Sequence, residues 1–490
     1  MAGRDQDIGK TTQGAGIPAN RAERTEQIAS PRAIYSDRLL SDRPDYRHGR
    51  RTDATEKVTS KFQYGILVEI KTINFRKETS ALFSKAGDQK LLQALNCTLV
   101  LNTIYHYGSI SRIDIAKKTK LSQSTVSNVV DMLQKDGYIV EAGTGSSTKA
   151  GGRKPTILKL RPQSGYMVAV ALITEAYHIS LQICLYDLLL NLVDEVELEL
   201  GEKGQALVEV MVAEVRRFIG NHADKPIMGI GFSVPTVLDS NGVVYRGHLL
   251  ELEQYPLEQE LRKAFPSVYL VVEQEQHAAI LGERTAGPAK DVQNLIYVTV
   301  GRGIGSSVIA NNRLIRGEFG GAGEIGHMSI NKYGPKCICG KNGCLRLYAT
   351  ELAFINKIKE AVATEISLSP RIYNPALDQI NVREVYGLAA EGDRFCRELL
   401  ESLLDDLCTG LSNMIYLFNP KMIIIGGNLL AAESLALPYI SAKLQEIMDL
   451  PAANVRVVGA RLGRHSSVCG IASIILDKQF LKKELLMRNA

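Results

Sequence analysis

Apolar and polar positions change their pattern twice along the chain. Residues 1–84 contain few apolar side chains and alternate arginine with aspartate, as in SDRLLSDRPDYRHGRRTDATEK. A segment of this composition buries little surface, so we expect a weakly structured extension. Residues 85–160 carry apolar residues at helical spacing, whereas in residues 161–490 short β-rich runs such as YMVAVALI and KMIIIGG alternate with helical stretches. The pattern predicts a small helical domain followed by an α/β region.

The helical segment has the pattern of a helix-turn-helix followed by a wing. QKLLQALNCTLVLNTIYHYG predicts one helix that ends at Gly108, and Ser111 and Ser122 can each cap a shorter helix. The residues expected on the inner faces of the two short helices are Ile113, Ile115, Ala116, Val126, Val129, Val130 and Leu133. After Gly137, the runs YIVEA and TILKL predict a two-stranded wing. The alternative is a plain three-helix bundle.

The second short helix begins with small and polar residues, the kind that enter the major groove and meet base edges. These residues are Gln123, Ser124, Thr125, Ser127 and Asn128. Glutamine and asparagine can each pair with adenine through two hydrogen bonds, and a threonine methyl can contact thymine. The preceding helix and turn offer cations for phosphates, namely Arg112, Lys117, Lys118 and Lys120. Taken one at a time, each of these residues would favour the alternative, a solvated polar face.

The wing segment SSTKAGGRKPTILKL favours DNA binding over that alternative. Gly151 and Gly152 allow a close approach to a nucleic-acid backbone. Arg153 and Lys154 place cations at the tip, and arginine can enter a narrow, electronegative minor groove. A basic glycine turn that directly follows a helix-turn-helix predicts double-stranded DNA as a partner.

Three of the eight cysteines lie within CICGKNGC, shortly after the histidine of GEIGHM. The four candidate metal ligands are His327, Cys337, Cys339 and Cys344. Thiolates suit Zn²⁺, which takes four nitrogen or sulfur ligands in structural sites. Gly340 and Gly343 let the chain fold tightly around an ion, whereas buried reduced cysteines seldom gather in glycine-rich turns. We therefore predict a structural zinc site within residues 324–346.

The composition of the chain indicates its cellular compartment but does not identify a binding partner. A chain of 490 residues exceeds one ordinary domain, and its net charge of +5 is too small to identify a partner. The N-terminus lacks an apolar signal region, and no run of about 18 apolar residues suggests a membrane span. We expect a cytoplasmic protein with reduced thiols, in which clustered cysteines hold metal. The remaining cysteines are expected in the core: Cys97, Cys184, Cys396, Cys408 and Cys469.

Two groups of motifs resemble those of the ROK family (repressors, open reading frames, kinases). ISRIDIAKKTKLSQSTVSNVVDMLQKDGYIVEAG with GGRKPTILKL resembles its DNA-binding half, and GEIGHM with CICGKNGC resembles its zinc signature. The resemblance covers roughly residues 85–485. It implies an N-terminal winged helix-turn-helix followed by a two-lobed actin-like (ribonuclease H-like) ATPase fold, with zinc beside a sugar pocket. Lys120 stands where the family usually has glycine, so we expect strain or an altered turn there.

The kinase-like half departs from the family at its catalytic positions. Where the family has an Asp-x-Gly-x-Thr turn for phosphate, the chain reads VAVALITEAYHISL, with the β-branched Ile173. Gln274 and Glu275 replace an Asn-Asp pair, and misplacing a catalytic carboxylate by about an ångström can cost about 100-fold in rate. Phosphoryl transfer needs both a phosphate cradle and a positioned base. We expect no catalytic residues and no enzyme activity. The alternative hypothesis is an active sugar kinase that carries a DNA-binding domain.

The resemblance also implies an effector site. In the family the glutamate and histidine of GEIGH contact sugar hydroxyls, which carries over to Glu324 and His327, and we add Gln274 and Glu275. Arg346 stands where the family usually has a glutamate. It could pair bidentately with an acidic or phosphorylated sugar. Equally, the pocket could be empty and Arg346 could bridge to Glu275 or Glu324, in a scaffold that needs no ligand.

The sequence therefore predicts a DNA-binding transcriptional regulator, a repressor of carbohydrate-related genes. Its expected partners are a double-stranded DNA operator and a sugar or sugar-derivative effector. We expect a homodimer or homotetramer, because two-fold symmetry matches palindromic half-sites. Effector binding would favour one arrangement of the DNA-binding domains over another.

Overall fold

The computed structural model describes residues 89–145, 154–174, 178–247, 250–363, 372–374, 379–449 and 454–481. The extension expected at residues 1–84 and the tip of the wing lie outside the described residues. The chain from Ala86 to Ala490 forms one compact unit. No helix of the described ranges is long and apolar enough to cross a membrane.

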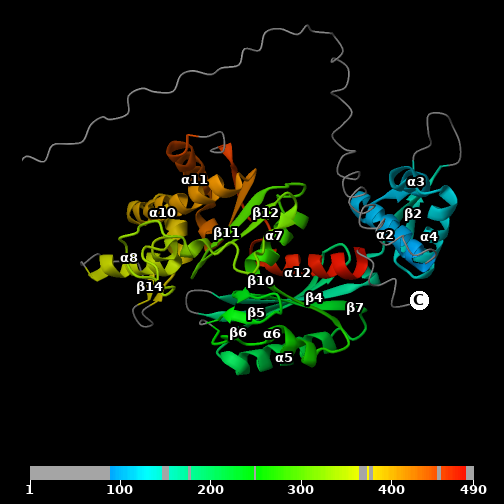
Figure 1. Ribbon diagram of the computed structural model, residues 1–490, viewed down its shortest axis with the longest axis horizontal. Helices are drawn as coiled ribbons and strands as arrows, with labels where there is room; N and C mark the ends of the chain where they lie inside the picture. The colour runs from blue at the N-terminus through cyan, green and yellow to red at the C-terminus, as the bar shows by residue number, and fades with distance from the viewer. Residues whose placement is uncertain are drawn as a thin grey trace, which may run out of the picture. The chain divides into compact units, whose positions relative to one another are not determined.

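The described chain begins with three helices and a small sheet (Figure 1). Its elements are α2 (Gln89–Tyr107), β1 (Ile110–Ser111), α3 (Arg112–Thr119), α4 (Gln123–Lys135), β2 (Ile139–Thr144) and β3 (Thr156–Leu160). The strand order is β1-β3-β2, and both pairs are antiparallel. The two strands of the predicted wing are present, and β1 adds a third strand that the sequence pattern did not predict.

Hydroxyl caps begin both short helices, as predicted. Ser111 Oγ accepts a hydrogen bond from the backbone N–H of Asp114 at 3.2 Å, and Ser122 Oγ accepts one from Thr125 at 3.0 Å. Lys120 ends α3 with a φ of 58°, in the left-handed region. The expected strain at this position is thus real, because a left-handed backbone costs an L-residue about 1 kcal/mol or more.

The apolar faces of α3 and α4 form the core of the helix-turn-helix. The predicted inward residues that are buried are Ile115, Ala116, Val126, Val129, Val130 and Leu133. The prediction for Ile113 is wrong, because its side chain is 47% exposed. Residues four apart share a face of a helix, so Ile113 lies with the exposed Lys117.

The first large sheet has the strand order β10-β7-β4-β5-β6. Its strands are β4 (Tyr166–Thr174), β5 (Ile179–Asp187), β6 (Leu192–Leu200), β7 (Ile227–Val234) and β10 (Tyr269–Gln274). β4, β7 and β10 run parallel, whereas β5 and β6 are antiparallel to their neighbours. Val168 and Val170 face α5 (Gly204–Gly220) and α6 (Leu257–Ala264), whereas Met167 and Ala169 face α12 (Ser466–Leu476). Figure 1 shows α12 and the α5–α6 pair on opposite faces of this sheet.

The second large sheet has the strand order β13-β12-β11-β16-β17. Its strands are β11 (Leu295–Val300), β12 (Ile304–Ala310), β13 (Arg313–Leu314), β16 (Met422–Gly427) and β17 (Arg456–Gly459). One face packs against α8 (Glu351–Ala363), α9 (Val382–Glu391), α10 (Arg394–Phe418) and α11 (Glu433–Ile447). The other face packs against α7 (Glu275–Thr285). Two short pairs complete the strands: β8 (Val237–Leu238) with β9 (Val244–Arg246), and β14 (Tyr373–Asn374) with β15 (Gln379–Ile380).

Helices α7 and α12 cross at very short range through two glycines. A Cβ on Gly470 would lie 1.8 Å from the carbonyl oxygen of Ala278, and a Cβ on Gly282 would lie 2.1 Å from that of Ser466. Glu283, which is fully buried, fixes the crossing. Its carboxylate accepts hydrogen bonds from Ser466 Oγ at 2.7 Å and from the backbone N–H groups of Arg461 and Leu462 at 3.0 and 2.9 Å.

The end of α12 reaches the DNA-binding domain. The chain continues as η7 (Asp477–Leu481), where the ring of Phe480 packs edge-on against Tyr138, with centroids 5.3 Å apart. Asn102 Nδ2 donates a hydrogen bond to the carbonyl oxygen of Leu481 at 2.9 Å. A single helix therefore joins the crossing to the helix-turn-helix.

We expect Gly470→Ala to destabilise the protein by about 1–3 kcal/mol, because the added methyl overlaps the Ala278 backbone and must push the two helices apart. Denaturant or thermal unfolding measures the effect. Gly387→Ala in α9 is the matched control, since a Cβ there meets nothing within 4 Å. That control should be neutral or stabilising. If both variants unfold at the same midpoint, the crossing does not depend on Gly470.

Candidate functional site

The exposed face of α4 carries the residues predicted to read DNA. Gln123, Ser124 and Asn128 are exposed, while Thr125 and Ser127 are half-buried. The hydroxyls of Ser124 and Thr125 are each 2.8 Å from that of the cap residue, Ser122. Within the part of the chain that the structure describes, the side-chain amides of Gln123 and Asn128 bond to nothing. These two amides are therefore available for base edges.

Arg112 does not extend into solvent as a free cation. Its Nη1 atom lies 2.7 Å from Asp131 Oδ1, and its Nη2 atom donates to Gln134 Oε1 at 2.9 Å. The guanidinium thus braces α3 against α4. It would have to leave Asp131 to contact a phosphate.

The remaining predicted cations surround the helix-turn-helix. Lys117, Lys118, Lys120 and Lys154 are exposed. Lys118 Nζ lies 3.9 Å from the centre of the Tyr107 ring. Arg153 lies outside the described residues. The described lysines suit contacts to the phosphate backbone, which position a protein without reading sequence.

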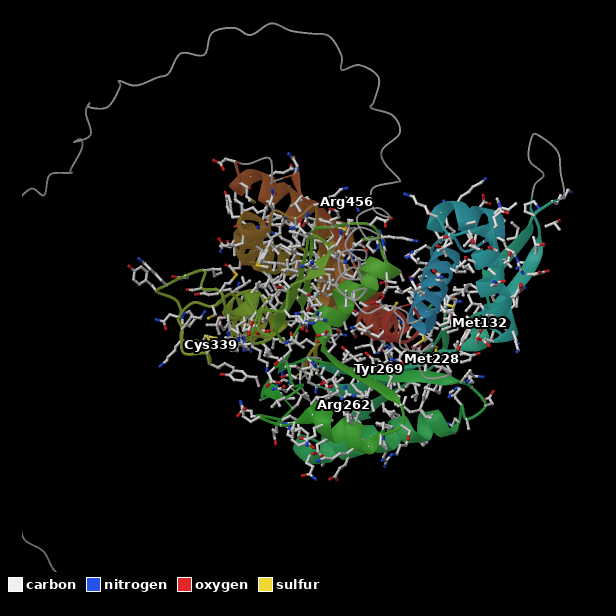
Figure 2. All side chains as sticks on the ribbon, turned by 45° about the vertical axis from the view of Figure 1, so that its right-hand side comes forward. Met132, Met228, Arg262, Tyr269, Cys339 and Arg456 are labelled. Carbon is white, nitrogen blue, oxygen red and sulfur yellow. The ribbon has the colours of Figure 1, made fainter. Side chains whose placement is uncertain are left out.

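The histidine and three cysteines of the predicted zinc site converge in space. The donor atoms of His327, Cys337, Cys339 and Cys344 all lie within 4.8 Å of one another. Cys337 Sγ is 3.6 Å from His327 Nδ1, and Cys339 Sγ is 3.5 Å from Cys344 Sγ. Tetrahedral zinc with Zn–S bonds of about 2.3 Å would separate two thiolates by about 3.8 Å, so the set fits the ion closely. Figure 2 shows Cys339 on an irregular loop and not on a strand.

Two glycines give the loop its shape. Gly340 and Gly343 have φ values of 90° and 61°, as the sequence led us to expect. A Cβ on Gly343 would lie only 1.7 Å from the carbonyl oxygen of Asn331. An isolated antiparallel bridge pairs Ser329 with Cys344 and brings the last cysteine back beside the first part of the motif.

Two of these thiols have shifted pKa values. A backbone N–H from Lys341 holds the pKa of Cys339 below its ordinary value. Burial raises the pKa of Cys344 to about 12. The second thiol resists ionisation beside the other donors, and a divalent cation would remove that resistance because metal binding replaces the thiol proton.

The residues that replace the Asn-Asp pair lie where β10 passes into α7. Gln274 Nε2 donates to the carbonyl oxygen of Gly320 at 2.7 Å, so part of this side chain holds a neighbouring loop. Glu275 is the first residue of α7, and burial raises its pKa to about 7. A carboxyl group with that pKa is partly neutral at physiological pH and can donate as well as accept hydrogen bonds.

Two short 3₁₀ helices bring Arg346 next to the GEIGH motif. η2 (Ile325–His327) follows Glu324, and η3 (Leu345–Leu347) contains Arg346. A Cβ on Gly326 would lie 3.6 Å from Arg346 Cβ. Among the described residues, the Arg346 guanidinium forms no ion pair with Glu275 or Glu324. A charged effector and an empty pocket both stay open as predictions for this position.

Sequence reasoning missed a buried ionic network beside this region. His277 Nδ1 lies 3.0 Å from Glu273 Oε1, and Arg316 Nε donates to Glu273 Oε2 at 3.2 Å. Burial alone would raise the pKa of Glu273, but these two partners hold it below its ordinary value. The E-x₃-H spacing across the start of a helix was a visible signal, whereas Arg316 gave none because it lies far along the chain.

The segment expected at the first phosphate turn of a kinase remains a β-strand as far as Thr174. β4 stays in strand pairing through Ile173, which faces Ser180, and the chain does not curl at that residue. Residues 175–177 lie outside the described part. The GRGIG segment forms the tight turn between β11 and β12, where the N–H of Gly301 donates to the carbonyl oxygen of Gly303 at 3.0 Å.

Known proteins share both parts of the chain. The sequence pattern of the ROK family matches residues 180–478, and that of the MarR family matches residues 95–140. The xylose repressor of Caldicellulosiruptor bescii is 32% identical, over 80% of this chain and 98% of that protein. The DNA-binding transcriptional dual regulator NagC of Escherichia coli is 27% identical, over 80% of this chain and 95% of that protein.

Solved structures show the same fold. A ROK family transcriptional regulator described as a homologue of the Escherichia coli MLC protein superposes with a TM-score of 0.68 and 22% identity, over 81% of this chain and 98% of that one. A ROK family glucokinase from Streptomyces griseus superposes with a TM-score of 0.55 and 21% identity, over 63% of this chain and 99% of that one. The predicted fold class, a winged helix-turn-helix followed by a two-lobed actin-like domain, is confirmed. With more than half of its length matched by the family pattern and a relative 32% identical along most of it, the chain belongs to the ROK family.

Proposed function

We propose that this protein is a DNA-binding transcriptional repressor of carbohydrate-related genes. The observation that carries the proposal is the exposed face of α4, where the side-chain amides of Gln123 and Asn128 follow a capped turn and lie clear of other described groups. Similarity to a xylose repressor and to NagC along four-fifths of the chain supports the same function. A protein that regulates genes works where the DNA is, which agrees with the expected cytoplasmic location.

The ROK domain acts in this proposal as a sensor and dimerisation body and not as a kinase. Ile173 continues a strand where the family curls around phosphate, and Glu275 has a longer side chain than the aspartate it replaces. We retain the division into an extension (1–84), a DNA-binding domain (85–160) and a ROK domain (161–490), with a homodimer or homotetramer as the assembly.

A structural zinc ion belongs to this proposal. His327, Cys337, Cys339 and Cys344 would hold it, and with four protein ligands it would have no open position for catalysis. Its role would be to fix the irregular loop against η2. In that position it would also orient His327 beside the effector pocket.

The effector would be a sugar derivative that carries negative charge. Arg346 is half-buried next to η2 and is not used by a described carboxylate. A planar guanidinium can pair with a carboxylate or phosphate through two hydrogen bonds. Glu324 and Glu275 would accept or donate hydrogen bonds to the hydroxyl groups of such a ligand. A ligand of this kind would act by stabilising one arrangement of the DNA-binding domains.

We expect Asn128→Ala or Gln123→Ala to weaken binding to the operator about 10–100-fold, because each amide can contribute about 1–3 kcal/mol of base discrimination. The operator would first be selected from random double-stranded DNA, and affinity measured at one fixed salt concentration. Arg394→Ala in α10 removes an exposed cation outside the helix-turn-helix and should change nothing. Unchanged affinity in both amide variants would refute readout by this face of α4.

Cys339→Ser should lower the zinc content of the protein by about one ion per chain, because a three-ligand remnant holds a structural ion poorly. Metal analysis of desalted protein measures the content, and a lower melting temperature should accompany the loss. Cys408→Ala, a buried cysteine of α10 outside the cluster, should keep the ion. Equal zinc in the two variants would contradict the ligand set.

A thermal-shift screen against neutral, amino, acidic and phosphorylated sugars tests the effector. A ligand at 100 times its dissociation constant should stabilise the protein by about 2.7 kcal/mol. We expect a hit with an acidic or phosphorylated sugar that disappears in Arg346→Ala and persists in Arg313→Ala, an exposed arginine on β13. If no sugar of the panel raises the melting temperature, with zinc bound and the fold intact, the result would instead favour a scaffold that needs no ligand.

A further inference from the structure

A second group of metal-binding side chains lies far from the zinc cluster in the sequence. The donor atoms of Cys184, Glu195 and His465 all lie within 4.8 Å of one another. His465 Nε2 is 2.7 Å from Glu195 Oε2, and Cys184 Sγ is 3.9 Å from the same oxygen. The three donors lie close enough to share one ion, which would replace the hydrogen bond between His465 and Glu195, since zinc binds sulfur at about 2.3 Å and nitrogen or oxygen at about 2.0–2.2 Å.

Three separate elements build this group. Cys184 on β5 and Glu195 on β6 are direct partners in the antiparallel register. His465 ends η6 (Gly463–His465) and precedes the first residue of α12. The buried crossing at Glu283 holds this turn in place through Arg461, Leu462 and Ser466. The three donors are thus positioned by rigid elements before any ion binds.

Gln182 gives a second, independent indication of a ligand. Its side chain is 1% exposed, yet its oxygen Oε1 has no hydrogen-bond partner among the residues that the structure describes. Residues two apart on a strand share a face, so Gln182 lies beside Cys184, and its side chain hydrogen-bonds to Glu195. A buried amide oxygen without a donor costs free energy unless something binds it. Because its side chain bonds to one of the three donors, Gln182 is the candidate for the fourth ligand.

We propose that Cys184, Glu195 and His465 form a second metal site, for Zn²⁺ or another divalent transition metal that binds thiolate. Gln182 Oε1 or a water molecule would complete four-coordination. The donor set of one sulfur, one nitrogen and one or two oxygens suits such metals better than Ca²⁺ or Mg²⁺, which prefer oxygen alone.

The residues around the three donors allow a metal ion to enter from solvent, and they leave the charge of the ion to be balanced by its ligands. The side chains of Glu195 and His465 are 47% and 30% exposed, so an ion can reach the site from solvent. Arg464, the nearest cation in sequence, already pairs with Glu197. Burial raises the pKa of Cys184 to about 12, so this thiol keeps its proton without a metal. Binding of M²⁺ would form the metal–sulfur bond and release the thiol proton to solvent, while the neutral His465 ring would carry its proton on Nδ1 so that Nε2 can bind the ion; no oxidation state changes.

An ion here would join the first sheet to the start of α12. This metal site does not depend on the proposed role in DNA binding, because it needs only the contacts of β5, β6 and the turn before α12. It differs from the cluster at His327 in every ligand, so the two sites can be removed independently.

Metal content of the full-length chain tests the proposal. Protein saturated with Zn²⁺ and then desalted should hold two ions per chain in the wild type and one in Cys184→Ser. The double variant Cys184→Ser/Cys339→Ser should hold none. Cys469→Ser is the matched control: this cysteine is buried in α12 within the same core cluster but outside the site, and the variant should keep two ions.

Co²⁺ substitution gives a second readout that does not depend on counting ions. Absorption from thiolate-to-cobalt charge transfer should fall by about a quarter in Cys184→Ser, because one of four coordinating thiolates is lost. His465→Gln, at a partly exposed position, serves if Cys184→Ser fails to fold, and it should also hold one ion. One ion per chain in the wild type, or two in His465→Gln, would overturn the proposal.

Discussion

The contact between α7 and α12 is the constraint on which the rest of the ROK domain depends. Gly282 and Gly470 bring the two helix backbones into contact, and the buried Glu283 ties one helix to the turn that begins the other. Through Ala279 and Ile280, α7 also packs on the second sheet, while Ile471 and Ile475 of α12 pack on the first. Glycines on the sheet leave room for those isoleucines, since a Cβ on Gly231 would lie 2.4 Å from Ile471 Cγ2. Both sheets are therefore anchored to the same close-packed crossing of α7 and α12.

This crossing gives a physical route between the proposed pocket and DNA. α7 begins at Glu275, beside the loop held by Gln274, and α12 ends at the Phe480–Tyr138 contact. Because close-packed backbones move together and do not compress, a ligand that displaces the start of α7 would also displace α12. The bond from Asn102 to the carbonyl oxygen of Leu481 would carry that displacement into α2. The route requires two discrete arrangements of the crossing, and the ligand must bind one of them better.

The sequence predicted features whose interacting residues lie close together along the chain, and it missed those whose partners lie far apart. The caps at Ser111 and Ser122, the wing and the clustering of the four candidate metal ligands were predicted because each rests on spacing within a short segment. Ile113 was assigned to the core wrongly, since a short helix offers too few turns to fix which face is buried. The Arg316–Glu273 pair and the contact of His465 with Glu195 join residues 43 and 270 positions apart, and no local pattern marks them. The side chains at the candidate sites could therefore be named from the sequence. Which partners they bond to, as with Arg112 and Gln274, could be learned only from the fold.

The same distinction bears on the proposal that this kinase-like fold acts as a regulator and not as an enzyme. Phosphoryl transfer depends on a phosphate cradle and on a base placed to within about an ångström, and Ile173 and Glu275 occupy the positions expected for these two parts. Neither substitution harms packing, because Ile173 continues a paired strand and Glu275 still begins α7. The crossing glycines Gly282 and Gly470 serve the packing of the two helices, which a sensor needs as much as an enzyme does. In the proposed function the domain keeps this rigid crossing, and Arg346 supplies the charge that would recognise an acidic effector.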